Sequence, residues 1–388
     1  MRQSVKRLLL PAASVVAALA VLAAGATLLR LEVPEPTGGY PVGRSRLSWT
    51  DQSRPETHTE DPSDKREVVA TLWFPAQAGT GARAGYVERL SRTADGLVAS
   101  GELSRAAVRG LRYVRDPARV GAKISPAKES YPVVILSPGN LTNVEFYASI
   151  AEDLASHGYL VVGIDHPYQV AAVELAGGKV AVYDRAVAKG PDAAAAKVRE
   201  RVADLRFALD RLAEMKAAGD GIGRRMDLRR IGVMGHSNGG IAAVETCRVE
   251  PALGGCLNLD GQMAGGPFSY NADAGAPDQP FMYLTKEVQL HPALAARFEA
   301  GGAGTYRVVV PSAAHDHFAD GALFKPTLNP FARTPDHVIT VVRGFTRSFF
   351  DHALLGKSEK ALGRVAAPTD VYVNVYPLGG RPSIPQPA

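Results

Sequence analysis

The sequence contains little of what several classes of protein require. It has only two cysteines in 388 residues, and two thiols without further ligands do not make a zinc site. It has no internal repeat and no basic run with interleaved aromatic residues, because its 44 Lys and Arg residues are scattered. We therefore interpret the formal net charge of +5 as a charged surface and expect no nucleic-acid partner. What remains is an ordinary globular composition, 46% hydrophobic and 21% charged, in a chain long enough for a large core.

One long uncharged segment lies at the N-terminus. Three cations, Arg2, Lys6 and Arg7, precede residues 8–29, which is the pattern of an export segment. As a helix the segment would span roughly 33 Å, enough for an uncleaved anchor. Residues 24–26 (Ala-Gly-Ala) have the form of a cleavage site, so a signal peptide is the alternative. Either way, the positive-inside rule predicts an exported chain that is periplasmic, secreted or anchored to the outer face of the cytoplasmic membrane.

The two cysteines, Cys247 and Cys256, flank a short loop. In a chain sent to an oxidising compartment, this arrangement predicts a disulfide. The alternative is a pair of small buried hydrophobic side chains, and the distance between the two Cα atoms decides between them.

The rest of the chain predicts one domain over residues 34–376, between the N-terminal segment 1–33 and a loose tail at 377–388. Strands are expected at residues 44–49 and 68–74, with a polar surface loop at residues 51–65 between them.

Two further segments interrupt this domain. Residues 84–118 show helix-like spacing without strand signals, which predicts a helical insertion. Residues 170–184 predict a hairpin that turns at Gly177 and Gly178. We expect both segments to act as lid insertions beside a substrate entrance.

From Tyr131 onward, short apolar runs alternate with helical patterns, which predicts an α/β fold. Strands are expected at 133–136, 160–164, 231–234, 257–259, 281–284 and 306–310, with helices around 147–154 and 198–212, from about 240, and from 334 to about 349. Such alternation implies a mostly parallel sheet with helices on both faces.

Residues Gly235-His236-Ser237-Asn238-Gly239 are the most informative motif. An apolar strand precedes them and a helix follows, so the serine lies on a sharp strand-to-helix turn. Such a turn requires neighbours without side chains and leaves the serine hydroxyl above the edge of the sheet. Ser237 is therefore our candidate nucleophile; the alternative is an ordinary Gly-rich turn.

A serine hydroxyl needs a base to remove its proton. His315 is our candidate, because it follows the last predicted strand of the sheet, with His317 as the alternative. A different interpretation makes His315, Asp316 and His317 metal ligands, but the only clear third ligand nearby is Asp320.

The base in turn needs a carboxylate to orient it. Asp260 ends the strand that follows the nucleophile helix, so its side chain is expected at the same sheet edge. Glu287, just past the next strand, is a rival, and Asp165 precedes the serine and breaks the expected chain order. A helix-capping or loop role for Asp260 is a further alternative.

An oxyanion formed by attack of Ser237 needs backbone N–H donors. The fold places one donor directly after the nucleophile, at Asn238. The second is expected in the tripeptide Pro138-Gly139-Asn140, and because proline has no N–H we assign it to Asn140. The alternative is that this tripeptide is a plain turn.

With these residues in place, the chain resembles the platelet-activating factor acetylhydrolase family of α/β-hydrolases and its bacterial members. The resemblance is carried by residues 131–139 and 153–159, by the serine motif, by Leu259-Asp260, and by His315 with Phe318-Ala319-Asp320. It implies Ser237 as nucleophile, Asp260 as acid, His315 as base and the amides of Asn140 and Asn238 as the oxyanion hole. It also implies calcium-independent hydrolysis of short or oxidised acyl esters.

Two departures put the acyl-chain preference in doubt: Pro138 stands where better known members have histidine, and Asn238 where they have an aromatic residue.

The sequence thus predicts a serine carboxylic ester hydrolase with an acyl-enzyme on Ser237 and no metal or organic cofactor. Its expected partner is a small-molecule or lipid ester, and membrane contact would come through the N-terminal segment. The alternatives are a cutinase-like polyester or dienelactone-type hydrolase, and a non-catalytic hydrolase fold that binds an envelope partner.

Overall fold

The computed structural model describes residues 32–186, 193–219, 221–262, 277–286, 295, 298, 304–324, 335–358, 362 and 371–376. The predicted export segment at residues 8–29 and the predicted tail at 377–388 lie outside the described residues. Within the described part of the chain, no helix combines the length and apolar character that a membrane crossing requires.

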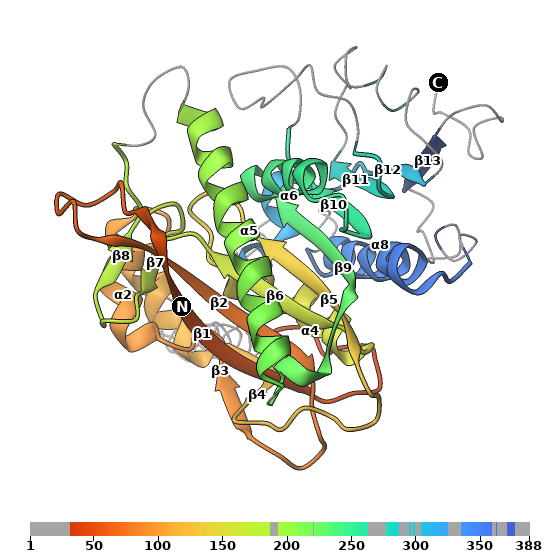
Figure 1. The fold of residues 1–388 in the computed structure, drawn as a ribbon, viewed down its shortest axis with the longest axis horizontal. Helices are drawn as coiled ribbons and strands as arrows, with labels where there is room; N and C mark the ends of the chain where they lie inside the picture. The colour runs from red at the N-terminus through yellow and green to blue at the C-terminus, as the bar shows by residue number, and fades with distance from the viewer. Residues whose placement is uncertain are drawn as a thin grey trace, which may run out of the picture.

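The described residues form an 11-stranded sheet in the order β13-β12-β11-β10-β9-β5-β6-β2-β1-β4-β3 (Figure 1). The strands are β1 (Val42–Pro55), β2 (Lys65–Pro75), β3 (Ala82–Gly85), β4 (Arg115–Val120), β5 (Tyr131–Ser137), β6 (Leu160–Asp165), β9 (Met226–His236), β10 (Gly255–Leu259), β11 (Phe281–Lys286), β12 (Thr305–Val310) and β13 (Tyr372–Tyr376). The six strands from β6 to β12 in this order pair in parallel, and β1, β2 and β13 add antiparallel pairs.

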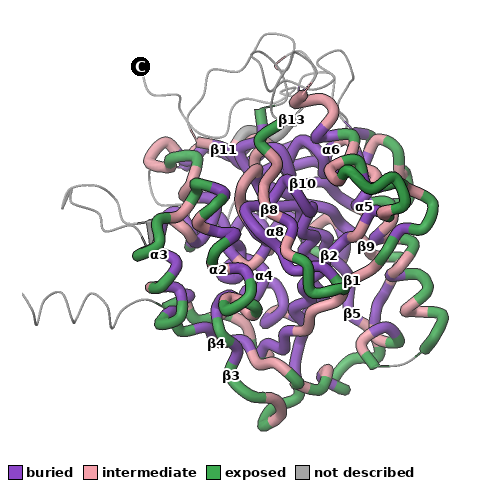
Figure 2. The backbone as a smooth tube through the Cα atoms, turned by 90° about the vertical axis from the view of Figure 1, so that its left-hand side faces the viewer, coloured by how far each residue is buried: buried purple, intermediate pink, exposed green. Residues whose placement is uncertain are grey.

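Helices cover both faces of the sheet. Helices α4 (Ala148–Ser156) and α8 (Pro335–Leu355) share one hydrophobic core with the sheet, and α5 (Ala193–Ala218) and α6 (Asn238–Val249) share another. Alternate residues of β5 enter different cores: Val134 and Leu136 the first, Val133 and Ile135 the second. In Figure 1, α5 crosses in front of the sheet, and Figure 2 shows the central strands buried. This arrangement confirms the predicted α/β class with a mostly parallel sheet.

The sequence predicted a helical insertion at residues 84–118, but the structure contains strands as well as helices in this segment. Helices α2 (Leu90–Ala99) and α3 (Arg105–Gly110) and the short 3-10 helix η1 (Leu111–Tyr113) lie between β3 and β4, which pair with each other and extend the edge of the sheet. The strand β4 was missed because its sequence, Arg-Asp-Pro-Ala-Arg-Val, is polar and contains a proline. Its Asp116 is nevertheless buried, since it pairs with the equally buried Arg44 at 2.7 Å.

The loop predicted at residues 51–65 is also shorter than expected, because β1 continues to Pro55. The strand β13 was not predicted. The hairpin at residues 170–184 is confirmed: β7 (Ala172–Glu174) pairs antiparallel with β8 (Val180–Val182) across the predicted turn, where Gly178 has a φ of +81°. This hairpin packs against α2.

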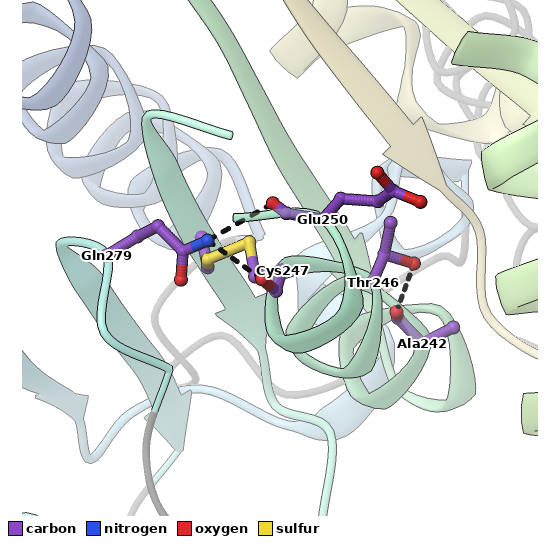
Figure 3. The surroundings of a disulfide bond; sticks show 6 residues. Ala242, Thr246, Cys247, Glu250 and Gln279 are labelled. Carbon is purple, nitrogen blue, oxygen red and sulfur yellow. Dashed lines mark hydrogen bonds between the residues drawn. A yellow bond between two sulfur atoms is a disulfide. The ribbon is translucent and has the colours of Figure 1, made fainter. Parts of the chain in front are cut away.

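A disulfide joins Cys247, near the end of α6, to Cys256, in β10 (Figure 3). Both residues are buried, and their Cα atoms lie 6.4 Å apart. The side-chain amide of Gln279 donates to the carbonyl oxygens of Cys247 (2.8 Å) and Glu250 (3.2 Å) beside it. The disulfide thus joins the end of α6 to the sheet, and the hydrogen bonds of Gln279 join it to the segment that precedes β11.

Candidate active site

Ser237 lies on the tight turn between β9 and α6, with φ 54° and ψ −123°, a conformation that residues with side chains rarely adopt. The turn depends on its glycines. A Cβ atom on Gly235 would lie 2.2 Å from the carbonyl oxygen of Gly239, and one on Gly239 would lie 2.2 Å from that of Ser137. Any other residue at these two positions would force the backbone apart, so the motif spacing has a steric cause.

Asp260 and His315 meet at the same edge of the sheet. Asp260 directly follows β10, and His315 begins the 3-10 helix η4 (His315–Phe318) beyond β12. The Nδ1 atom of His315 lies 2.6 Å from Oδ2 of Asp260. The aspartate side chain is 3% exposed and the histidine side chain 47%, so the carboxylate is buried behind the imidazole.

Two further groups hold the Asp260 carboxylate. The Thr285 hydroxyl donates to its Oδ1 atom at 2.6 Å, and the backbone N–H of Lys286 donates to the same atom at 3.3 Å. Burial acts to raise the pKa of Asp260, but the hydrogen bonds from His315 and Thr285 outweigh it and leave that pKa below its ordinary value. Asp260 is therefore ionised at neutral pH, as an orienting group for an imidazole must be.

Asn258 shapes the turn that carries Asp260, and the sequence analysis did not identify it. Its side-chain amide accepts from the N–H of Gly261 (2.7 Å) and donates to the Gly261 carbonyl (3.0 Å). These two hydrogen bonds close the turn that contains Asp260, whose φ is 50°. Asn258 also explains the glycine directly after the motif, because a Cβ atom on Gly240 would lie 2.2 Å from the Asn258 Oδ1 atom. The sequence feature that could have identified Asn258 is its position between two leucines of a buried strand.

Ser237 and His315 line the same cavity, which has a volume of about 410 Å³. Loop residues 139–142 line it beside the serine, together with Phe146 and Ala171. The insertion contributes Glu102, Leu103, Ala107, Gly110, Leu111 and Val114. Most of these lining side chains are apolar, so the cavity suits a largely apolar ligand.

The loop after β5 offers one backbone donor at the cavity. The N–H of Gly139 donates a hydrogen bond to the Tyr147 hydroxyl at 2.9 Å. The N–H of Asn140 makes no hydrogen bond with any residue that the structure describes. Asn238 is the first residue of α6, so its N–H belongs to the helix turn that has no intrahelical carbonyl partner.

His236, directly before the serine, was also missed. Its Nδ1 atom lies 2.8 Å from the Tyr147 hydroxyl, and its ring centre lies 4.6 Å from that of His315. Burial, together with the charge that His315 can carry, lowers the pKa of His236 to about 3. His236 therefore stays neutral at physiological pH and adds no positive charge beside His315.

The alternatives from the sequence occupy other places. Nδ1 of His317 accepts the N–H of Ala314 at 3.2 Å, within its own turn. Asp165 accepts from the N–H of Val144 at 2.9 Å, and burial raises its pKa to about 7. Glu287 lies outside the described residues.

The metal interpretation involved Asp320 as a ligand. Asp320 instead accepts a hydrogen bond from the N–H of Ser149 at 3.1 Å. Among the described residues, no group of three or more His, Cys, Asp or Glu side chains is arranged to hold a metal ion.

The sheet is mostly parallel and lies between two helical layers; it carries a serine on a strand-to-helix turn and, at the same edge, a histidine that contacts a carboxylate. These features define the class, an α/β-hydrolase. Comparisons with known proteins narrow this class. Residues 28–187 match the family model described as "Platelet-activating factor acetylhydrolase, isoform II". Over that segment, which is less than half of the chain, the protein is similar to the platelet-activating factor acetylhydrolase family of α/β-hydrolases.

Two curated relatives carry related names. The chain is 25% identical over 268 residues to a probable 1-alkyl-2-acetylglycerophosphocholine esterase of Arthroderma benhamiae (65% of this chain, 64% of that protein). It is 24% identical over 282 residues to the platelet-activating factor acetylhydrolase of Cavia porcellus (66% of this chain, 60% of that protein). The chain thus spans somewhat less than two thirds of the length of these relatives.

Among solved structures, a ferulic acid esterase from Streptomyces cinnamoneus is similar to this chain along nearly its whole length. The two are 30% identical, with a TM-score of 0.72, and the match covers 88% of this chain and 98% of the esterase.

Proposed function

We propose that the protein is a serine carboxylic ester hydrolase that works through an acyl-enzyme on Ser237. The observation that carries this proposal is the geometry at the sheet edge: His315 lies 2.6 Å from Asp260 and lines the same cavity as Ser237. The names of the relatives, all of them esterases or acetylhydrolases, support the reaction class.

In this mechanism, the Ser237 oxygen attacks the ester carbonyl while Nε2 of His315 takes its proton. Asp260 holds the opposite ring nitrogen and stabilises the imidazolium that forms. The N–H groups of Asn140 and Asn238 stabilise the oxyanion. His315 then donates the proton to the departing alcohol, and a water molecule, deprotonated by the same imidazole, hydrolyses the acyl-enzyme. Every step uses side-chain or backbone groups of this chain.

For the substrate, we propose an ester with an apolar acyl group, with short-chain or oxidised lipid esters first, following the names of the curated relatives. Residues 84–118 and 170–184 act as a lid over the cavity. This role is supported by the fact that residues of the insertion, and Ala171 of the hairpin, line the cavity. A second candidate, an aromatic-acid ester, is favoured by the higher identity and fuller coverage of the ferulic acid esterase.

We also propose that the chain is exported. The cations Arg2, Lys6 and Arg7 before the uncharged residues 8–29 support this, and membrane contact, if the segment is retained, would occur there.

The reaction is tested with Ser237→Ala and, as a matched control, Ser63→Ala on the exposed loop after β1. We expect Ser237→Ala to abolish hydrolysis of p-nitrophenyl acetate, whereas Ser63→Ala keeps wild-type turnover. A fluorophosphonate probe should label the wild-type protein and not Ser237→Ala. Undiminished turnover in Ser237→Ala would remove this site from consideration, and a wild-type protein that neither turns over nor is labelled would favour the non-catalytic envelope-binding alternative.

The substrate class is tested by comparing kcat/KM on a short-chain phospholipid analogue, on methyl ferulate and on a soluble polyester fragment. We expect the phospholipid analogue to rank first. A higher value for methyl ferulate would transfer the proposal to aromatic esters, and a higher value for the polyester fragment to the cutinase-like alternative.

A further inference from the structure

A buried arginine lies behind the loop that carries Asn140. Arg201, on α5, is fully buried, and its guanidinium donates to two consecutive carbonyl oxygens of this loop, those of Pro138 (2.5 Å) and Gly139 (3.4 Å). Its Nε atom donates to the side chain of Gln169 at 2.7 Å, which fixes the plane of the guanidinium. None of these contacts was foreseen from the sequence.

The carbonyl contacts determine where the loop N–H groups point. In a trans peptide, the C=O and the following N–H point in opposite directions. The Pro138 carbonyl points at Arg201, and the N–H of the same peptide, on Gly139, is bonded to Tyr147. The Gly139 carbonyl also points at Arg201, so the N–H of Asn140 must point away from α5. Asn140 lines the cavity beside Ser237.

We propose that Arg201 is a positioning residue for the oxyanion hole: it orients and polarises the peptide between Gly139 and Asn140 so that the Asn140 N–H stabilises the oxyanion. This inference rests on the proposed function. The polarisation follows from charge, because a cation at a carbonyl oxygen draws electron density from the peptide and makes its N–H a stronger donor.

The charge of Arg201 is directed at the loop. Among the described residues, no carboxylate forms an ion pair with Arg201, whereas the nearby Arg66 pairs with Asp204 at 2.7 Å. Burial lowers the pKa of Arg201 to about 10, so the guanidinium remains protonated at neutral pH. The two loop carbonyls are therefore principal acceptors for this cation.

A second chain of hydrogen bonds secures the start of the loop. Oγ of Ser137 lies 2.9 Å from Nε2 of His166, and Nδ1 of His166 lies 2.9 Å from Oδ2 of Asp204. This has the connectivity of a catalytic triad, but all three residues are buried away from solvent and cannot reach a substrate. Burial lowers the pKa of His166 to about 4, so it is a neutral link. Its role is to tie the last residue of β5 to α5, one turn from Arg201.

The test compares Arg201→Met and Arg201→Lys on a matched oxygen ester and thionoester. Sulfur is a weaker hydrogen-bond acceptor than oxygen, so a thionoester gains less from the oxyanion donors. We expect Arg201→Met to lower kcat on the oxygen ester by roughly 10- to 100-fold, with KM within about twofold and a much smaller loss on the thionoester. Arg201→Lys, which keeps a cation, should lie between Met and wild type. The control is Arg206→Met on the same helix, whose exposed side chain pairs with Glu250.

The outcomes separate the two proposals. Equal losses on the two esters in Arg201→Met would overturn the positioning role while leaving the hydrolase intact. A wild-type protein inactive on both esters would instead overturn the proposed function. If neither Arg201 variant folds, Gln169→Met, which removes the acceptor of Arg201 Nε together with the amide that donates to Glu200 (2.8 Å) and to the Lys197 carbonyl (3.4 Å), must lower the ester-to-thionoester rate ratio by several-fold. An unchanged ratio in that variant contradicts the inference.

Discussion

At the scale of single residues, two backbone conformations shape the candidate site. Ser237 and Asp260 both have positive φ, a state that costs of order 1–3 kcal/mol for residues with side chains. The neighbouring strands hold them there: the N–H of Ser237 donates to the Leu259 carbonyl and that of Asp260 to the Leu284 carbonyl, each at 2.9 Å. The strain is confined to these residues, and the hydrogen bonds from the neighbouring strands hold them in the strained conformation.

Our prediction at this scale concerns the acid. Asp260→Asn should lower kcat by about 10⁴-fold on p-nitrophenyl acetate, because an amide favours the wrong tautomer of His315. Thr285→Val, which removes one donor to Asp260, should lower kcat only by roughly tenfold. Steady-state kinetics of both variants, with Glu287→Gln alongside, measure the order of the effects. A loss of several orders of magnitude in Glu287→Gln, with Asp260→Asn near wild type, would assign the acid to Glu287.

At the scale of elements, α6 is held at both ends by different means. Its start is part of the serine turn, where the N–H of Ile241 donates to the Ser237 carbonyl at 3.1 Å. Its far end is joined to β10 by the disulfide between Cys247 and Cys256. Stability and catalysis are therefore expected to depend on opposite ends of this helix.

The double variant Cys247→Ala with Cys256→Ala tests this separation. The two cysteines are 9 residues apart, and closing so short a loop restricts the unfolded chain by roughly 2–3 kcal/mol. We expect the free energy of unfolding to fall by about that amount, measured by urea denaturation, while kcat on p-nitrophenyl acetate stays within about twofold. Adding reductant to the wild-type protein should reproduce the loss, and have no effect on the double variant. A large fall in kcat at full occupancy of the folded state would contradict the separation.

At the scale of the whole molecule, buried carboxyl groups connect the insertion, α4 and the segment after His315. Asp320 accepts hydrogen bonds from the Ser149 N–H (3.1 Å) and the Tyr86 hydroxyl (3.3 Å). Burial raises the pKa of Asp320 to about 7, so the folded protein holds a proton there that an unfolded chain releases near pH 4. The same holds for Asp165.

This linkage predicts how stability depends on pH. Between about pH 4 and pH 7, Asp320 holds a proton in the native state that it lacks in the unfolded state, so its contribution to stability falls as the pH rises through this window. The buried His166 and His236, whose pKa values are lowered, act in the opposite direction, so the Asp320 contribution is isolated by comparing a variant with the wild type. Asp320→Asn mimics the protonated acid, so its stability relative to the wild type should be higher at pH 8 than at pH 5. Urea denaturation of both proteins at pH 5 and pH 8 measures the difference. The same change in stability between pH 5 and pH 8 in the wild type and the variant would contradict the linkage.

Much of the fold and of the candidate site was predictable because it depends on local pattern. The apolar runs and helical spacings predicted β5, β6, β9 to β12 and the helices that cover them. The spacing of glycines around Ser237 reports a steric constraint within a few residues, and chain order pointed to Asp260 and His315. The strand β4 was not predictable, because its buried Asp116 is tolerated only through Arg44, more than seventy residues earlier.

The sequence by itself determined the α/β class and the serine turn, and it indicated the resemblance to a known family and the candidates for the catalytic residues, since each is encoded in neighbouring residues or in chain order. Only the tertiary structure decided that His315 rather than His317 faces Asp260, that Asn258 brackets the aspartate, and that Arg201 binds the loop carbonyls. The physical reason is that these are pairings between polar groups far apart in the chain. A buried polar side chain is stable only with its partner, and strand register and helix packing bring that partner into place.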